Sequence, residues 1–350
     1  MNRMIRPAIA AIAAIAVATL ALTGCSAGSA PQTTPTPESI DGTSITVYNA
    51  QHEELAQEWA DEFSKQTGVT VTLRNGSDSE LGNQLVQEGA ASPADVFLTE
   101  NSPAISLVDN AGLFAGVDAD TLAQVPDAYK PSTGTWTGIA ARSTVFVYNP
   151  SLLPESELPK SMLDLAQPQW KGRWAASPSG ADFQAIVSAV LEKEGTATTE
   201  SWLAGMKENA AVYKGNSTVM KAVNAGEVPA GVIYHYYWFI DQAGTGENSA
   251  NTKLFYFKNQ DPGAFVSVSG GGVLKSSKNQ AAAQAFLKFI TGKAGQDILR
   301  TGTSFEYPVG SEVEPNPALP TLGTLDAPVI DPSKLNSTEV TDLMTAAGLI

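Results

Sequence analysis

The chain has 350 residues, with 36 acidic and 21 basic side chains and a formal net charge of −15. Such an acidic chain is a poor partner for nucleic acids and anionic lipid surfaces, although acidity by itself is also explained by solubility alone. The one cysteine excludes an internal disulfide and a zinc site built from several thiolates.

The N-terminus is typical of a bacterial lipoprotein signal. Arg3 and Arg6 precede an apolar stretch over residues 8–22, and small residues then lead to Cys25. A short transmembrane anchor is the alternative, but this stretch falls below the ~20 residues that a membrane-spanning helix needs. We therefore predict a signal peptide over residues 1–24 and a lipid attached to Cys25.

Residues 25–43 are rich in Ser, Thr, Pro and Gly and contain almost nothing to bury. This composition predicts a flexible linker. The mature chain is then expected in the cell envelope, lipid-anchored to the outer face of the cytoplasmic membrane.

Strand-like and helix-like segments alternate from residue 44 onward, with glycines at several of the helix ends. The predicted strands cover residues 45–48, 69–73 and 95–99, and the helices after them cover 52–67, about 81–86 and 102–112. A βαβαβα order predicts an α/β fold with a parallel sheet.

The second half repeats the alternation, and the chain is long enough for two lobes. Further strands are predicted at 144–148, 173–176 and 231–234, and extended pieces at 255–258, 264–268 and 272–274. Helices are predicted at 181–194, 200–208, 281–291 and 339–347, with a short one that begins at residue 216 or 217.

Tyr236 and Tyr237 are the most informative pair in the chain. A phenol titrates near ~10 and is therefore a poor acid or base at neutral pH. A hard trivalent cation displaces phenol protons and prefers anionic oxygen, so paired phenolates suit Fe(III). Both side chains reach one ion only if the strand ends before Tyr236, because successive strand residues face opposite sides. Core packing of an aromatic run is the alternative.

Two further donors follow predicted strands. His52 comes after the first strand and Glu100 after the third, and ligands of open α/β sheets collect at such strand ends. The Glu100 carboxylate and the phenolates of Tyr236 and Tyr237 carry three negative charges, which would balance a triply charged ion. His52 would add a neutral nitrogen. Taken alone, His52 is equally explained as a helix cap or a surface residue.

An anion could complete the coordination. Ser179, Gly180 and Ala181 lead into a predicted helix, whose free backbone N–H groups attract anions, and Asn216 opens another helix. Ordinary helix capping is the alternative for both segments.

These motifs together resemble the bacterial ferric ion-binding proteins, the transferrin-like solute receptors of ferric iron ABC importers. The resemblance extends over nearly all of the mature chain. Its segments are residues 47–52, 93–100, 170–172, 226–230, 236–238, 260–264 and 306–308.

The resemblance implies a periplasmic-binding-protein-like fold, with two α/β lobes joined by hinge strands that close over Fe(III). Carried over, the metal ligands are His52, Glu100, Tyr236 and Tyr237. The same resemblance implies a synergistic anion, phosphate or carbonate. The residues expected to bind it are Ser179, Gly180, Ala181, Asn216 and Asn101.

Two positions depart from the family pattern. Asn101 stands where close relatives have Gln, and Tyr234-His235 stand where they have two asparagines. The departures leave the anion open and make Tyr234 a candidate extra ligand. We assign residues 44–145 and about 268–316 to lobe 1, and residues 146–267 and about 317–350 to lobe 2.

The predicted function is the extracytoplasmic substrate-binding component of an ABC importer, a monomer without enzymatic activity. Its partners would be a membrane permease and the cytoplasmic ATPase of that permease. A receptor for a small organic or oxyanion ligand is the main alternative. An extracellular hydrolase is less favoured, because the sequence lacks Gly-x-Ser-x-Gly and His-Glu-x-x-His, and a purely structural surface lipoprotein is less favoured still.

Overall fold

A computed structural model describes residues 39–350. The predicted signal peptide (1–24), Cys25 and most of the predicted linker (25–43) lie outside the described residues. Within residues 39–350, no helix is both long and apolar enough to span a membrane.

The described elements begin with alternating strands and helices, as predicted. The strands are β1 (Ser44–Asn49), β2 (Thr70–Asn75), β3 (Val96–Leu98), β4 (Thr137–Tyr148), β5 (Trp174–Ala176), β6 (Ala210–Val212), β7 (Ala230–Tyr234), β8 (Lys253–Phe255) and β9 (Val266–Val273). The α-helices are α1 (Glu53–Thr67), α2 (Asp78–Glu88), α3 (Ser102–Asn110), α4 (Ala119–Leu122), α5 (Ala181–Glu194), α6 (Thr196–Asn209), α7 (Asn216–Ala225), α8 (His235–Ala243), α9 (Gln280–Thr291), α10 (Lys293–Thr301) and α11 (Ser337–Ala346).

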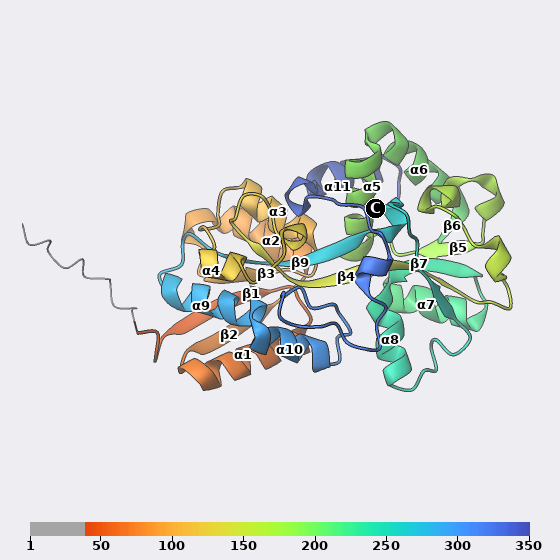
Figure 1. Ribbon diagram of the computed structural model, residues 1–350. Coiled ribbons are helices and arrows are strands. Elements are labelled where there is room, and N and C mark those ends of the chain that lie inside the picture. Colours follow the sequence, from red (N-terminus) through yellow and green to blue (C-terminus); the bar gives the residue numbers. More distant parts are fainter. Residues whose placement is uncertain (1–38) are drawn as a thin grey trace, which may run out of the picture. The chain divides into compact units, whose positions relative to one another are not determined.

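The strands form one mixed sheet in the order β2-β1-β3-β9-β4-β7-β5-β6, with β8 added to β4. Pairing is parallel within β1–β3 and within β5–β7, as expected for βαβ units. The parallel pairing predicted for the first three strands is confirmed, whereas the centre of the sheet is antiparallel, at β3–β9, β9–β4, β4–β7 and β4–β8. The reason is that β4 and β9 cross between the two halves in opposite directions (Figure 1).

β4 changes partner in its middle. Residues up to Ser143 pair with β9, and residues from Thr144 pair with β7. A third segment crosses beside them, because Tyr307 and Ala141 exchange two backbone hydrogen bonds of 2.8 and 2.9 Å. The predicted lobe exchange at residue 145 falls next to this change of partner; the lobes as separately moving bodies stay a prediction.

The crossing strands are where the sequence-based boundaries fail. β4 was predicted only from residue 144, since Arg142 and Ser143 interrupt the apolar pattern, yet all of β4 is buried. β9 is one strand rather than two pieces, because Gly270, Gly271 and Gly272 continue it through the tightly packed centre. The piece predicted at 255–258 overlaps the observed strand only at Phe255, since β8 covers Lys253–Phe255.

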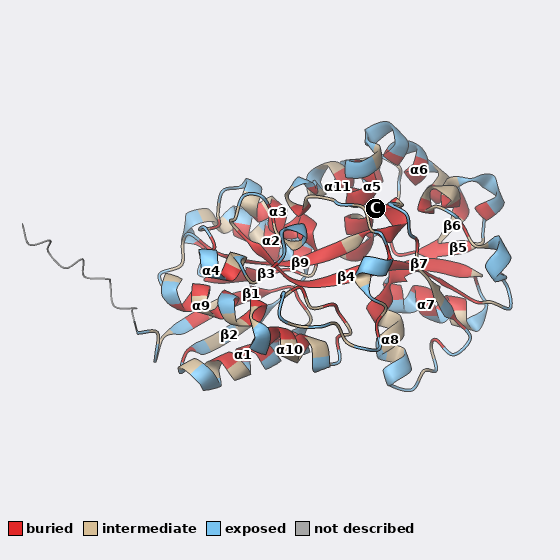
Figure 2. Ribbon diagram, in the orientation of Figure 1, coloured by how far each residue is buried: buried red, intermediate tan, exposed pale blue. Residues whose placement is uncertain are grey.

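Each half has its own apolar core, and Figure 2 shows the central strands buried and the outer faces of the helices exposed. The core of the first half gathers Val47, Trp59 and Phe286, and the core of the second gathers Phe183 and Trp202. The ends of β1, β3 and β7 are thereby fixed along the line where the two halves meet.

Gly271→Ala tests the close packing of β9. An added Cβ would lie 2.7 Å from Leu287 Cδ1 and 3.0 Å from Ile139 Cγ2. We expect the free energy of unfolding to fall by about 1–3 kcal/mol, the usual cost of overpacking, measured by urea denaturation. Gly116→Ala is the matched control because nothing lies within 4 Å of its Cβ position. Equal urea midpoints for the two variants would contradict the packing described.

Candidate metal centre

His52 lies in the short loop between β1 and α1. Asn49 Nδ2 donates to the Gln51 carbonyl (2.8 Å), and Gln51 Oε1 accepts from the His52 amide (2.8 Å), so the loop is fixed by its own side chains. The His52 side chain is 29% exposed. Its Nε2 atom is buried without a hydrogen-bond partner among the described residues. An imidazole nitrogen left unpaired in this way fits a metal ligand.

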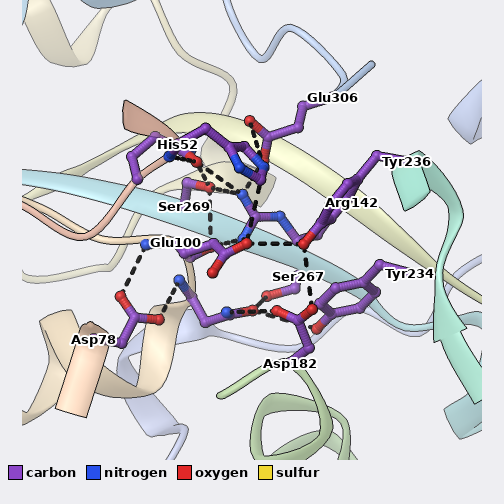
Figure 3. A network of polar contacts seen from close by, with 12 residues as sticks. His52, Asp78, Glu100, Arg142, Asp182, Tyr234, Tyr236, Ser267, Ser269 and Glu306 are labelled. Atoms are coloured by element: carbon purple, nitrogen blue, oxygen red, sulfur yellow. Dashed lines mark hydrogen bonds and ion pairs between the residues drawn. The ribbon is translucent and has the colours of Figure 1, made fainter. Parts of the chain in front are cut away.

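Glu100 follows β3 and faces His52. Asp78 Oδ1 accepts from the Glu100 amide at 2.9 Å, which fixes the backbone where the strand ends. Glu100 Oε1 lies 3.8 Å from His52 Nε2 and accepts from the Tyr236 hydroxyl at 2.8 Å. Three of the four predicted ligands are therefore in mutual contact (Figure 3).

Tyr236 and Tyr237 lie in the first turn of α8. β7 ends at Tyr234 and the helix begins at His235, which meets the requirement that the strand end before the pair. Successive helical residues are rotated by ~100°, so neighbouring side chains can face the same side. The two rings stack with centroids 4.3 Å apart, and the Tyr236 ring lies edge-on to His52 at 5.1 Å.

Asp182 is a site residue that the sequence analysis did not identify. It is the second residue of α5, is 5% exposed, and its Oδ2 accepts from the hydroxyls of Tyr236 (3.2 Å) and Tyr237 (3.1 Å). Asn101 Nδ2 donates to its Oδ1 (3.1 Å) and Asn216 Nδ2 donates to its Oδ2 (2.6 Å). Two residues expected to hold an external anion thus hold a carboxylate of the chain itself.

The remaining residues of the expected anion segment lie just before this carboxylate. Ser179 and Gly180 precede α5 and Ala181 opens it. Acidic residues are common in the first turn of a helix because the helix dipole favours them, so Asp182 carries no distinctive sequence signal. Its place directly after the predicted anion segment was the one available indication.

A buried ion pair lies next to Glu100 and His52. The Arg142 guanidinium, on β4, pairs with Glu306, and both side chains are fully buried. Arg142 also donates to the Glu100 carbonyl and, at 2.7 Å, to Ser269 Oγ, while its Nη1 lies 3.5 Å from Glu100 Oε1. The second carboxylate oxygen of Glu306, Oε2, is 4.0 Å from His52 Nε2. One positive charge therefore compensates the carboxylates on both sides of His52.

Burial shifts the titration of the donors in directions that suit a hard cation. Burial and the Arg142 charge lower the pKa of His52 to about 4, so its imidazole is neutral at physiological pH. Burial and the nearby Asp182 carboxylate raise the pKa of both Tyr236 and Tyr237 above the ordinary value for tyrosine. The two phenols keep their protons until a stronger positive charge displaces them.

The buried carboxylates are also shifted. Burial and then the Glu100 charge raise the pKa of Asp182 to about 6. The same two causes raise the pKa of Asp78 to about 8. Each of these carboxyls therefore keeps its proton to a higher pH than a free aspartate does.

Tyr234 lies apart from the other phenols. It is fully buried, its hydroxyl donates to Asn101 Oδ1 at 3.4 Å, and its ring centroid is 6.3 Å from that of Tyr236. The candidate extra ligand therefore contacts the amide that holds Asp182.

Two cavities are lined by His52 or by residues next to the other donors. One, of about 580 Å³, is lined by His52 together with residues of α1, α8 and the loop around Phe305. The other, of about 250 Å³, is lined by Asp78, Asn101 and Ala181 among others.

Within residues 39–350, no group of three or more His, Cys, Asp or Glu could hold a metal on its own. A site here depends on the oxygens of Tyr236 and Tyr237. This dependence favours a hard, highly charged cation over zinc or copper(I), which prefer nitrogen and sulfur.

Arg142→Met tests the buried ion pair. We expect a loss of about 3–5 kcal/mol in the free energy of unfolding, because the Glu306 carboxylate stays buried without its partner. Adding Glu306→Gln should recover a large part of this loss in urea denaturation. Lys253→Met is the control, since Lys253 pairs with Glu155 at an exposed position. If Arg142→Met shifts the urea midpoint no more than Lys253→Met, the ion pair does not stabilise the centre.

Comparison with known proteins identifies the family of the chain. Residues 91–328 match the family of bacterial extracellular solute-binding proteins. The chain is 69% identical over 306 residues to the Fe(3+)-binding periplasmic protein of Serratia marcescens, covering 87% of this chain and 90% of that protein. It is 37% identical over 323 residues to the major ferric iron-binding protein of Neisseria meningitidis serogroup B, covering 91% and 96%.

A solved structure extends the similarity to three dimensions. Iron-bound HitA from Pseudomonas aeruginosa matches with a TM-score of 0.82 and 40% identity over 88% of this chain and 100% of that one. Similarity of this extent in sequence and fold shows common descent. The chain therefore belongs to the bacterial ferric ion-binding protein family of extracellular solute-binding proteins.

Proposed function

We propose that this protein captures Fe(III) outside the cytoplasm and delivers it to the membrane permease of an ABC importer, as a binding protein and not as an enzyme. The observation that carries the proposal is the convergence of the unpaired His52 Nε2 with Glu100, Tyr236 and Tyr237. The names of its relatives, which include ferric-binding periplasmic proteins, support the same ion and the same compartment.

The proposed ligands are His52, Glu100, Tyr236 and Tyr237, with Asp182 as a fifth. In the hydrogen-bonded network, the two phenol protons point to carboxylate oxygens of Glu100 and Asp182. Fe(III) would displace both protons and take their place between the same oxygens. Acid would reverse the exchange and weaken binding.

Charge supports an internal carboxylate in place of an added anion. Two phenolates, Glu100, Asp182 and the Glu306 carboxylate paired with Arg142 carry five negative charges, against four positive charges from Fe(III) and the Arg142 guanidinium. A phosphate or carbonate would add further negative charge to a buried site that already carries a small excess. We propose that Asp182 takes the role expected of the synergistic anion and uses the amides of Asn101 and Asn216 for its orientation.

Tyr234 would then support Asn101 and stay outside the coordination shell.

Delivery requires that the two halves open and close about the crossing strands, with the metal stabilising the closed form. The lipid on Cys25, the permease and its ATPase belong to the same proposal, and the name of the Serratia relative supports a place outside the cytoplasm.

Ferric titration of the purified full chain tests the proposal. We expect a visible absorption band from phenolate-to-Fe(III) charge transfer, and a stoichiometry of one ion per chain. Tyr237→Phe should weaken the band and the affinity, because one anionic oxygen is lost. Tyr213→Phe, a phenol paired with Glu227 outside the site, is the matched control. A wild-type chain without a band, or equal titrations for the two variants, would refute the proposal.

Asp182→Asn separates the internal carboxylate from an external anion. Titration with Fe(III) in phosphate- and carbonate-free buffer should show a loss of at least about 10–100-fold in affinity, the range seen for changes around metal ligands. In the wild type, binding below the Asp182 pKa of about 6 must also displace the Asp182 proton. The affinity difference between wild type and variant should therefore be full above pH 6 and shrink as the pH falls below it.

The opposite pattern identifies an external anion. If wild-type binding needs added phosphate or carbonate, and Asp182→Asn keeps both its affinity and the wild-type pH dependence, Asp182 is not a ligand.

A further inference from the structure

His235 is a fully buried histidine, and it immediately precedes the tyrosine pair. Both of its ring nitrogens are hydrogen-bonded to backbone. The Ser143 amide donates to Nδ1 at 3.2 Å, and Nε2 lies 2.8 Å from the Phe305 carbonyl oxygen. Because a carbonyl only accepts, Nε2 carries the proton, and one neutral tautomer satisfies both contacts.

The two backbone groups belong to different crossing segments. Ser143 is the last β4 residue paired with β9 before β4 turns to β7. Phe305 lies two residues before Tyr307, which pairs with Ala141 of β4. A single imidazole, on the first residue of α8, thus joins both segments at the boundary between the halves.

The backbone around this contact is unusual. Phe305 has φ of 53°, a left-handed conformation that large side chains rarely adopt. The His235 ring packs on the Tyr307 ring with centroids 4.7 Å apart, and the carbonyl of Phe305 is directed at His235. Strained residues persist where their surroundings hold them, and His235 supplies part of that support.

The same segment continues into the metal centre. Glu306, the next residue, pairs with Arg142, and Tyr236, next to His235, donates to Glu100. His235 therefore stands between the hinge backbone and the phenols, and its ring lies edge-on to the Tyr236 ring with centroids 6.1 Å apart.

We propose that His235 is a positioning residue that couples the direction of the Tyr236 and Tyr237 phenols to the hinge between the two halves. This proposal rests on the proposed function in one respect, since the phenols are taken as Fe(III) ligands. A histidine that merely filled the core would affect stability alone, and the experiment separates these two roles.

Three full-chain variants test the proposal. His235→Phe keeps a ring against Tyr307 but leaves the Ser143 amide and the Phe305 carbonyl without the imidazole. His235→Gln offers one acceptor and one donor on a single amide. Asn209→Leu is the control, because Asn209 is also buried and donates to two backbone carbonyls outside the site, those of Leu165 and Gln167.

Two measurements are made on each variant: ferric titration with the charge-transfer band, and amide hydrogen exchange of the peptide containing Ser143. His235→Phe should lower the Fe(III) affinity about 10–100-fold, shift the band and speed amide exchange at Ser143. His235→Gln should bring the affinity, the band and the exchange rate part of the way back to their wild-type values. Asn209→Leu should lower the urea midpoint while the affinity and the band stay at wild-type values.

Wild-type affinity and band in His235→Phe would overturn the coupling, as would an equal loss of affinity in Asn209→Leu. Failure of the proposed function looks different, since the wild type itself would then give no band. Exchange at Ser143 needs no metal, so unchanged exchange in His235→Phe would overturn the hinge contact whether or not iron binds.

Discussion

The centre of this molecule is organised around one buried positive charge, the Arg142 guanidinium. It pairs with Glu306, donates to the Glu100 carbonyl and Ser269, and lies over the rings of Tyr234 and Tyr236 at 6.0 and 5.6 Å. A buried charge is tolerated only when it is paired and hydrogen-bonded. Without this cation, several carboxylates would face one another in a site of low polarity.

The position of Arg142 on β4 explains why the site lies beside the crossing strands. β4 brings the guanidinium to the point where β1, β3 and β7 end, and each of these strands is followed by one or two donors. The two halves contribute different proposed donors: His52 and Glu100 come from the first, and the tyrosines and Asp182 from the second. In the proposed function, an ion bound between them would stabilise the halves in contact, which would be the physical basis of capture by closure.

Most of the outer architecture could be predicted from the sequence, because β1 to β3 and the helices α1, α3 and α5 follow clear apolar periodicity. The centre could not be predicted in the same way. Arg142 breaks the pattern of β4, the glycines of β9 suggest a loop, and the aromatic run that forms α8 favours a strand by propensity. These conflicts occur in the segments that form the site, so local sequence patterns predict secondary structure least well there.

Among the site residues, His52, Glu100 and the tyrosine pair could be found because their positions after strands and their charges agree, and the family resemblance supports them. Asp182 could not, since an acidic residue in the first turn of a helix is ordinary. Only the three-dimensional contacts of Asn101, Asn216 and both phenols with its carboxylate mark it as part of the centre.

Anomalous diffraction at the iron absorption edge, from crystals of the ferric protein grown without phosphate or carbonate, tests the central claim most directly. We predict one iron peak per chain, bonded to His52, Glu100, Tyr236, Tyr237 and Asp182. A peak away from these residues would contradict the account. So would density for a separate anion between the iron and the amides of Asn101 and Asn216, with Asp182 turned away.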